Sequence, residues 1–161
     1  MSKVTIQNEA GFSLMPIVNS FCKCSIPDYE AVFNALESGK GWDAIKDSCT
    51  KDAAFTSQAG PLLSIKTLQG YAGFMQGANA AMPGCTFEIV SSAYDKKRNN
   101  AQITSVFKGT HSKEVKGFPP VTNKSTVSDY TYVMFFDEDQ KIKKILKVWN
   151  AHYSAGELGW N

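Results

Sequence analysis

The hydrophobic pattern of this chain changes its period at Pro83-Gly84. Before that point, apolar residues recur at spacings of three and four, as on one face of a helix. After it, apolar and polar residues alternate, as in strands that bury one face only. Helices followed by consecutive strands with polar turns are typical of an α+β fold, in which the helices cover one face of an antiparallel sheet. We therefore predict that fold class.

The first half of the sequence predicts three helices, over residues 27–38, 42–49 and 67–82. Gly39 should end the first helix, because glycine tolerates the left-handed conformation of a C-cap. Thr67 is a candidate N-cap for the third, because its hydroxyl can accept a hydrogen bond from the first turn.

Five strands are expected beside these helices. A short one ends before the Gly60-Pro61 break, and four longer ones follow the change of period. Polar runs at 95–100 and 137–140 should form hairpin turns between them. The expected strands cover residues 53–57, 86–94, 101–111, 126–136 and 142–152.

The length of 161 residues corresponds to one domain with a core of its own. Residues 1–26 are the least regular part, and we interpret them as an N-terminal arm. Residues 27–161 are expected to form the domain. Within the arm, Cys22 and Cys24 are too few for a structural zinc site, and we interpret the four cysteines as free thiols.

The charge balance argues against several classes of partner. A net charge of +2 gives no field that would favour nucleic acid or an anionic membrane. No apolar stretch approaches the roughly 20 residues that span a bilayer, and the N-terminus lacks the pattern of a secretion signal. The sequence therefore predicts a cytoplasmic protein that binds neither nucleic acid nor membrane.

Several short strings carry a resemblance to a known family. They are Gly-Thr-His at 109–111, Gly-Phe-Pro-Pro at 117–120, Phe-Asp-Glu-Asp-Gln-Lys-Ile at 136–142, Val-Trp-Asn at 148–150 and Glu-Leu-Gly at 157–159. With the helical opening, they make residues 27–160 similar to the nuclear-transport-factor-2-like (cystatin-like α+β cone) superfamily, and within it to the SnoaL-like polyketide cyclase branch. The resemblance implies three N-terminal helices packed on a strongly curved, mixed to antiparallel sheet, a cone with a central pocket.

The same resemblance makes cyclase chemistry doubtful. Cyclases of this branch use an Asp on the last strand as acid and base, supported by a Gln and a His on the preceding strand. Alignment on Trp149 places Val148 at the position of that Asp, and Tyr130 and Tyr132 fall near the Gln and His positions. A valine cannot move a proton.

Strand alternation gives an independent prediction of the pocket wall. On the last strand, Leu146, Val148 and Asn150 share a face that should look into the cone, with His152 beyond them. The opposite face, with Ile145 and Trp149, should be convex and should pair with a second copy of the chain.

On the preceding strand, Tyr130, Tyr132 and Met134 should point inward. The tyrosines could donate hydrogen bonds to a carbonyl or enolate oxygen, or could simply be core aromatics. His111 could serve as a base near neutral pH.

Two functions follow, and the sequence leaves both open. The first is a non-catalytic module that binds a small apolar or carbonyl-containing ligand in the cone. Asn150, Val148, Leu146, His152 and Met134 would line that pocket. The alternative is an isomerase, cyclase or dehydratase in which Tyr130 and Tyr132 polarise the substrate and His111 moves a proton. Neither histidine has a second His, Asp or Glu at the sequence spacing that metal ligands require, so no metal or other cofactor is expected.

Overall fold

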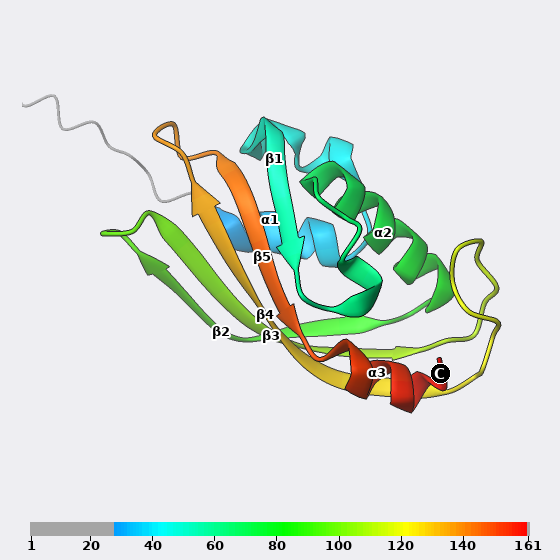
Figure 1. The fold of residues 1–161 in the computed structure, drawn as a ribbon. Coiled ribbons are helices and arrows are strands. Elements are labelled where there is room, and N and C mark those ends of the chain that lie inside the picture. The colour runs from blue at the N-terminus through cyan, green and yellow to red at the C-terminus, as the bar shows by residue number, and fades with distance from the viewer. Residues whose placement is uncertain (1–27, 161) are drawn as a thin grey trace, which may run out of the picture.

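The computed structural model describes residues 28–160, which form a strongly curved five-stranded sheet with helices in its concave side (Figure 1). The strand order is β1-β5-β4-β3-β2, and the sheet is open at both edges. β1 pairs with β5 in parallel, and every other pair is antiparallel. The predicted α+β class, with a curved mixed sheet, is confirmed. The strands are β1 (Cys49–Ser57), β2 (Thr86–Asp95), β3 (Asn100–Thr110), β4 (Ser125–Phe136) and β5 (Ile142–Trp149).

Two helices, α1 (Tyr29–Glu37) and α2 (Leu68–Ala81), lie in the concave side of the sheet (Figure 1). Thr67 caps α2 as predicted, its hydroxyl accepting from the Gly70 amide at 3.1 Å. Gly39 follows the end of α1 with a φ of 65°, which is the left-handed conformation expected there.

Two predictions about local structure were wrong. The segment expected as a helix over 42–49 forms two 3₁₀ turns, η1 (Trp42–Ala44) and η2 (Lys46–Ser48), before β1 begins at Cys49. The last strand ends at Trp149 rather than near residue 152. The side chain of Asn150 accepts from the Tyr153 amide at 3.1 Å and so caps a further helix, α3 (Ala151–Leu158).

The two faces of β5 are the reverse of what we expected. Ile145 is 0% exposed and Lys147 7%, whereas Val148 is 60% exposed. Leu146 and Val148 therefore lie on the convex face, and Ile145 and Trp149 on the concave face. The prediction failed because it placed the two lysines that alternate with Ile145 in solvent, although one of them is buried. The face expected to pair with a second copy is thus inside the domain.

The core between α1, α2 and the sheet is built largely from aromatic rings. Phe55 on β1 stacks on Tyr71 of α2 with ring centroids 4.0 Å apart, and Phe33 of α1 meets Tyr132 of β4 edge-on at 5.3 Å. All four side chains are fully buried. Two of these rings carry hydroxyl groups, which need hydrogen-bonding partners when they are buried. The core must therefore also contain polar side chains, and these belong to the candidate functional site.

The N-terminal arm and the Cys22–Cys24 pair lie outside the described residues. No helix within residues 28–160 is long and apolar enough to cross a membrane.

Candidate functional site

A buried carboxylate stands at the centre of the concave side. Glu37 is the last residue of α1 and is 1% exposed. It continues the apolar stripe of that helix, four residues after Phe33, so its side chain must enter the core. Asn79 of α2 holds it in place, because its side-chain amide donates to the Glu37 backbone carbonyl at 2.8 Å.

Three tyrosine hydroxyls surround this carboxylate. Tyr130 donates to Glu37 Oε2 at 2.5 Å, Tyr132 donates to Oε1, and Tyr71 lies 3.2 Å from Oε1. The hydroxyls of Tyr71 and Tyr132 also hydrogen-bond each other. A buried carboxylate needs such donors, because the loss of its hydration is costly.

Lys147 of β5 completes this group. Its Nζ donates to the Tyr71 hydroxyl at 2.8 Å and lies 3.8 Å from Glu37 Oε1. The same nitrogen lies over the ring of Tyr130, 4.2 Å from the centroid. A cation is favoured above an aromatic face, so the rings partly replace the water that Lys147 has lost. We call Glu37, Tyr71, Tyr130, Tyr132 and Lys147 the polar cluster.

Burial shifts the acid–base behaviour of this cluster. The pKa values of Tyr71, Tyr130 and Tyr132 lie well above that of free tyrosine, first because burial disfavours the phenolate and second because Glu37 repels it. Burial lowers the pKa of Lys147, and the negative charge of Glu37 opposes that shift. Ionisable groups with shifted pKa values often cluster at functional sites.

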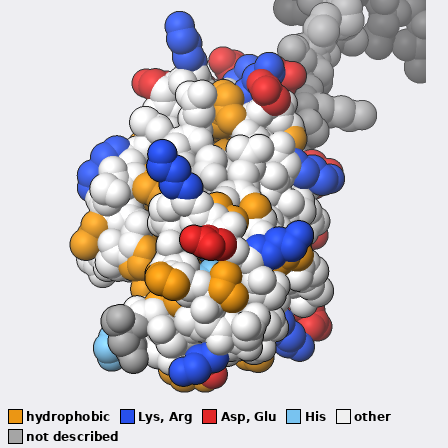
Figure 2. All heavy atoms as spheres, turned by 90° about the vertical axis from the view of Figure 1, so that its right-hand side faces the viewer, with side chains coloured by type: hydrophobic (Ala, Val, Ile, Leu, Met, Phe, Trp, Pro, Cys, Tyr) orange, Lys and Arg blue, Asp and Glu red, His pale blue; other side chains and the backbone are white. Residues whose placement is uncertain are grey.

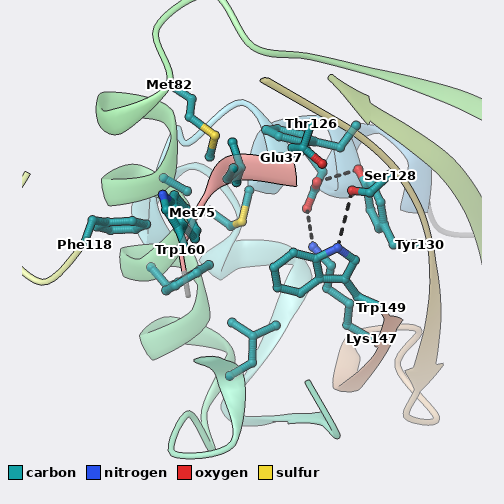
Figure 3. A pocket seen from close by; sticks show the side chains of 15 residues that line it. Glu37, Met75, Met82, Phe118, Thr126, Ser128, Tyr130, Lys147, Trp149 and Trp160 are labelled. Carbon is teal, nitrogen blue, oxygen red and sulfur yellow. Dashed lines mark hydrogen bonds and ion pairs between the residues drawn. The ribbon is translucent and has the colours of Figure 1, made fainter. Parts of the chain in front are cut away.

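The polar cluster forms one end of a cavity of about 50 Å³ (Figure 3). Glu37, Tyr130 and Lys147 reach its wall, with Ser128 and Thr126 beside them on β4, and the rest of the lining is mainly apolar. The cavity has room for a few water molecules or a small compound, and a larger guest would need side chains to move. The other lining residues are Leu62, Phe74, Met75, Ala78, Met82, Phe107, Phe118, Trp149, Leu158 and Trp160.

The opposite end of the cavity is closed by side chains from three separate segments. Phe118 comes from the connection between β3 and β4, and its ring lies 5.6 Å from that of Phe74 on α2 and 6.1 Å from that of Trp160. The Trp160 indole donates to His111 Nδ1 at 2.9 Å. We call Phe74, Phe118 and Trp160 the mouth. Figure 2 shows this end of the molecule, where hydrophobic side chains lie in small groups among charged ones.

The structure brings only some of the predicted site residues to the cavity. Tyr130 lines it, and Tyr132 contacts it indirectly through Glu37. Met134 points inward as expected but is fully buried in the core away from the lining. His111 is fully buried beneath Trp160 and does not line the cavity, and its Nε2 has no hydrogen-bond partner within the described chain.

The predicted wall residues of the last strand lie elsewhere. Leu146 and Val148 are on the convex face, because the two faces of β5 are reversed. Asn150 uses its side-chain oxygen to cap α3, and His152 is exposed on that helix. The strand ends before either residue could point into the cone.

Sequence reasoning missed Glu37 and Lys147, although each carried a signal. Glu37 falls on the apolar stripe of α1, and Lys147 alternates with Ile145 and Trp149. A charged residue at an apolar position is a candidate for burial with a partner. Two such residues of opposite sign would have suggested the pair. Among residues 28–160, no group of three His, Cys, Asp or Glu side chains could hold a metal ion.

An α+β cone around a pocket is typical of one class of small domains. Comparisons with known proteins show to which family of that class the chain belongs. The profile of the SnoaL-like domain family matches residues 29–145. The chain therefore belongs to the SnoaL-like family, as the sequence resemblance implied. A comparison with curated proteins gives no match.

Solved structures share this fold at low sequence identity. IdmH from Streptomyces antibioticus, a proposed polyketide cyclase, is 18% identical, with a TM-score of 0.63 over 81% of this chain and 95% of that one. A proposed SnoaL-like polyketide cyclase from Jannaschia sp. is 10% identical, with a TM-score of 0.65 over 83% and 92%. A protein with a ketosteroid-isomerase-like fold from Catenulispora acidiphila, in complex with trimethylamine, is 12% identical, with a TM-score of 0.60 over 84% and 95%.

Proposed function

We propose that this protein binds a small, mainly apolar molecule that carries a carbonyl oxygen. One observation supports this most directly: the buried polar cluster opens onto a cavity whose other walls are mainly apolar. Sites for small molecules commonly combine apolar walls with a few polar groups that fix orientation. The cytoplasmic location remains a prediction beside this proposal.

The free hydrogen-bonding capacity of the polar end favours a carbonyl oxygen. Lys147 Nζ has three N–H donors and uses one on the Tyr71 hydroxyl. The Trp149 indole N–H is shared between Ser154 at 3.0 Å and Ser128 at 3.4 Å, so Ser128 accepts there and its own hydroxyl hydrogen is available. A ligand oxygen could accept from a further N–H of Lys147 and from the Ser128 hydroxyl, whereas an apolar ligand end would leave both donors unpaired.

The test is ligand binding followed at the methionine methyl groups by NMR. In a titration with small cyclic ketones, the methyl signals of Met75 and Met82 should shift, because both residues line the cavity. The methyl signal of Met134 should stay, because that side chain is buried in the core. Equal shifts at all three, or none at any, would contradict the proposal.

A matched pair of substitutions on α2 sharpens this test. Ala78→Met fills the cavity wall and should weaken ketone binding by at least about tenfold. Ala80→Met lies on the exposed side of the same helix and should bind as the wild type does. Similar affinities for the two variants would place the binding site elsewhere.

A second candidate function is proton transfer at the bound ligand. The carboxylate of Glu37 lines the cavity beside the Tyr130 hydroxyl, so the domain holds a base and an acid although its last strand lacks the Asp of the cyclases. In this proposal Glu37 takes the role that the sequence had suggested for His111. Exchange of the α-hydrogens of a bound ketone for deuterium should be accelerated by the protein and lost in Tyr130→Phe. Exchange at the buffer rate with wild-type protein would refute it.

We further propose that two copies pair through the convex face of the sheet. In residues 28–160 no helix covers that face (Figure 1), and it carries half-buried Val133 and Leu146 beside Val148. A symmetric dimer would shield these side chains from water. Native mass spectrometry at micromolar concentration should show a dimer that Val148→Asp converts to a monomer. A wild-type monomer would count against pairing.

A further inference from the structure

Lys147 brings a primary amine to the polar end of the cavity. The residue is 7% exposed and lines the cavity beside Glu37 and Tyr130 (Figure 3). Its nitrogen lies over the rings of both Tyr130 and Tyr132. A buried lysine in an otherwise mainly apolar pocket can act as a nucleophile, because its amine gives up its proton more readily than an exposed one.

We propose that Lys147 forms a reversible imine with an aldehyde or ketone bound in this cavity. The inference rests on the proposed function, since the carbonyl compound must first occupy the same site. It adds a covalent step that simple binding does not include.

The contacts of Lys147 are consistent with a reactive amine. Its distance of 3.8 Å from Glu37 Oε1 exceeds the 2.7–2.9 Å typical of a charge-assisted hydrogen bond. The nitrogen is therefore not locked in a tight ion pair. Its one hydrogen bond goes to Tyr71, which leaves the side of the nitrogen at the cavity wall free to meet a ligand.

Groups from three elements besides β5 set the protonation of this amine. Glu37 of α1 favours the cation, as do the faces of Tyr71 from α2 and of Tyr130 and Tyr132 from β4. Burial opposes them and is the larger influence, so the pKa of Lys147 lies below that of an exposed lysine. A larger share of Lys147 is then neutral at a given pH than of a lysine in water.

The reaction balances with the groups present. The nitrogen lone pair of neutral Lys147 adds to the carbonyl carbon, and a proton passes from nitrogen to oxygen to give a carbinolamine. An acid then protonates that hydroxyl, water leaves, and the nitrogen loses its second proton as the C=N bond forms. Tyr130 and Glu37 share a hydrogen bond at this wall and can donate and accept those protons. No oxidant or reductant is needed.

The test traps the imine with a reductant. Wild-type protein is incubated with butanone and sodium cyanoborohydride near neutral pH, which adds hydride to the iminium carbon and leaves a stable secondary amine. Peptide mapping by mass spectrometry then locates the added group. We expect Lys147 to be labelled at least about tenfold faster than Lys143, because a ketone held in the cavity meets the Lys147 amine at a high effective concentration. The labelling rate at Lys147 should level off below the pH at which a free lysine amine titrates, because burial lowers the pKa of Lys147.

Two variants and one parallel measurement separate the possible outcomes. Lys147→Arg keeps the positive charge but has no amine nucleophile, so it should lose the label at this position. In the wild type, butanone should shift the Met75 and Met82 methyl signals in parallel. Lys143→Met should be labelled at Lys147 as the wild type is. If butanone shifts those signals but Lys147 reacts no faster than Lys143, the imine is refuted and the binding function stands. If butanone neither shifts them nor labels Lys147, both proposals fail.

Discussion

The two ends of the cavity are built in different ways. At the polar cluster, five side chains from α1, α2, β4 and β5 are buried and hydrogen-bonded to one another. At the mouth, Phe118 and Trp160 meet through ring edges and belong to a loop and to the residues after α3. The polar end is therefore fixed by many mutual bonds, whereas few interactions hold the mouth. We infer that the polar end contributes to folding and that the mouth is displaced more easily.

The largest effect should come from removing the carboxylate at the polar end. Glu37→Ala leaves Lys147 and three tyrosine hydroxyls buried without their shared partner. Breaking a buried ion pair in this way costs about 3–5 kcal/mol. Denaturant unfolding should show that loss, whereas Asn34→Ala on the exposed side of the same helix should stay within about 0.5 kcal/mol of wild type. Equal stabilities for the two variants would show that the polar end does not contribute to folding.

Alkaline pH should weaken the polar end next. The pKa values of Tyr71, Tyr130 and Tyr132 are raised in the folded state, so the unfolded chain releases these protons first, from about pH 10 upward. Their stabilising effect is complete below that pH. Above it, each tyrosine lowers the free energy of unfolding by about 1.4 kcal/mol per pH unit. The lowered pKa of Lys147 acts in the opposite direction up to its unfolded value of 10.5 and so offsets part of the loss.

The measurement is thermal unfolding across that pH range, with tyrosinate absorbance recorded alongside. Tyrosinate from these three residues should appear together with unfolding rather than before it. Ionisation of all tyrosines in a protein that is still folded would contradict the account.

A smaller loss is expected when one hydroxyl is removed from the polar end. Tyr132→Phe deletes a donor to Glu37 and a partner of Tyr71, which should cost about 1–3 kcal/mol because buried polar groups lose a bond. Tyr153→Phe removes a hydroxyl that donates to Glu157. Because Tyr153 is 51% exposed, this loss should change stability by less than about 1 kcal/mol. Calorimetric melting compares the two, and the order of their costs is the decisive result.

The smallest change in stability is expected at the mouth. A Cβ on Gly77 would lie 2.8 Å from the Phe118 ring, whereas one on Gly73 would meet nothing within 4 Å. Gly73→Ala should stabilise α2 by about 0.5–1 kcal/mol through its helical preference. Gly77→Ala should gain less, because Phe118 must move aside, and tryptophan fluorescence should report the altered surroundings of Trp160. A Gly77→Ala spectrum identical to wild type would show that the mouth is not so easily displaced.

The sequence was sufficient for the architecture because period and turn residues are local signals. The change of period at Pro83-Gly84 and the cap at Thr67 sufficed for α2 and the strands that follow it. The site was harder, because it depends on contacts between distant segments. Only Tyr130, Tyr132 and Met134 were correctly placed on the concave side.

The reversed faces of β5 show why the predictions for the site residues of the last strand failed. A lysine normally marks a solvent-exposed position. Lys147 can be buried because Glu37, 1% exposed on a helix far earlier in the chain, supplies the opposite charge beside the tyrosines. Strand alternation could not reveal that partner. Nor could it reveal that Asn150 would cap a helix rather than continue the strand.

The parallel pairing of β1 with β5 has a consequence for how the chain folds. It joins a strand near the start of the described chain to one near its end, and the polar cluster likewise links Glu37 to Tyr132, 95 residues away. Contacts between such distant segments form slowly, because the long stretch of chain between them must first lose conformational freedom. We expect the helices and the β2–β3–β4 hairpins to assemble early and β5 to dock last. During synthesis, therefore, the pocket cannot gain its amine until nearly the whole domain has left the ribosome.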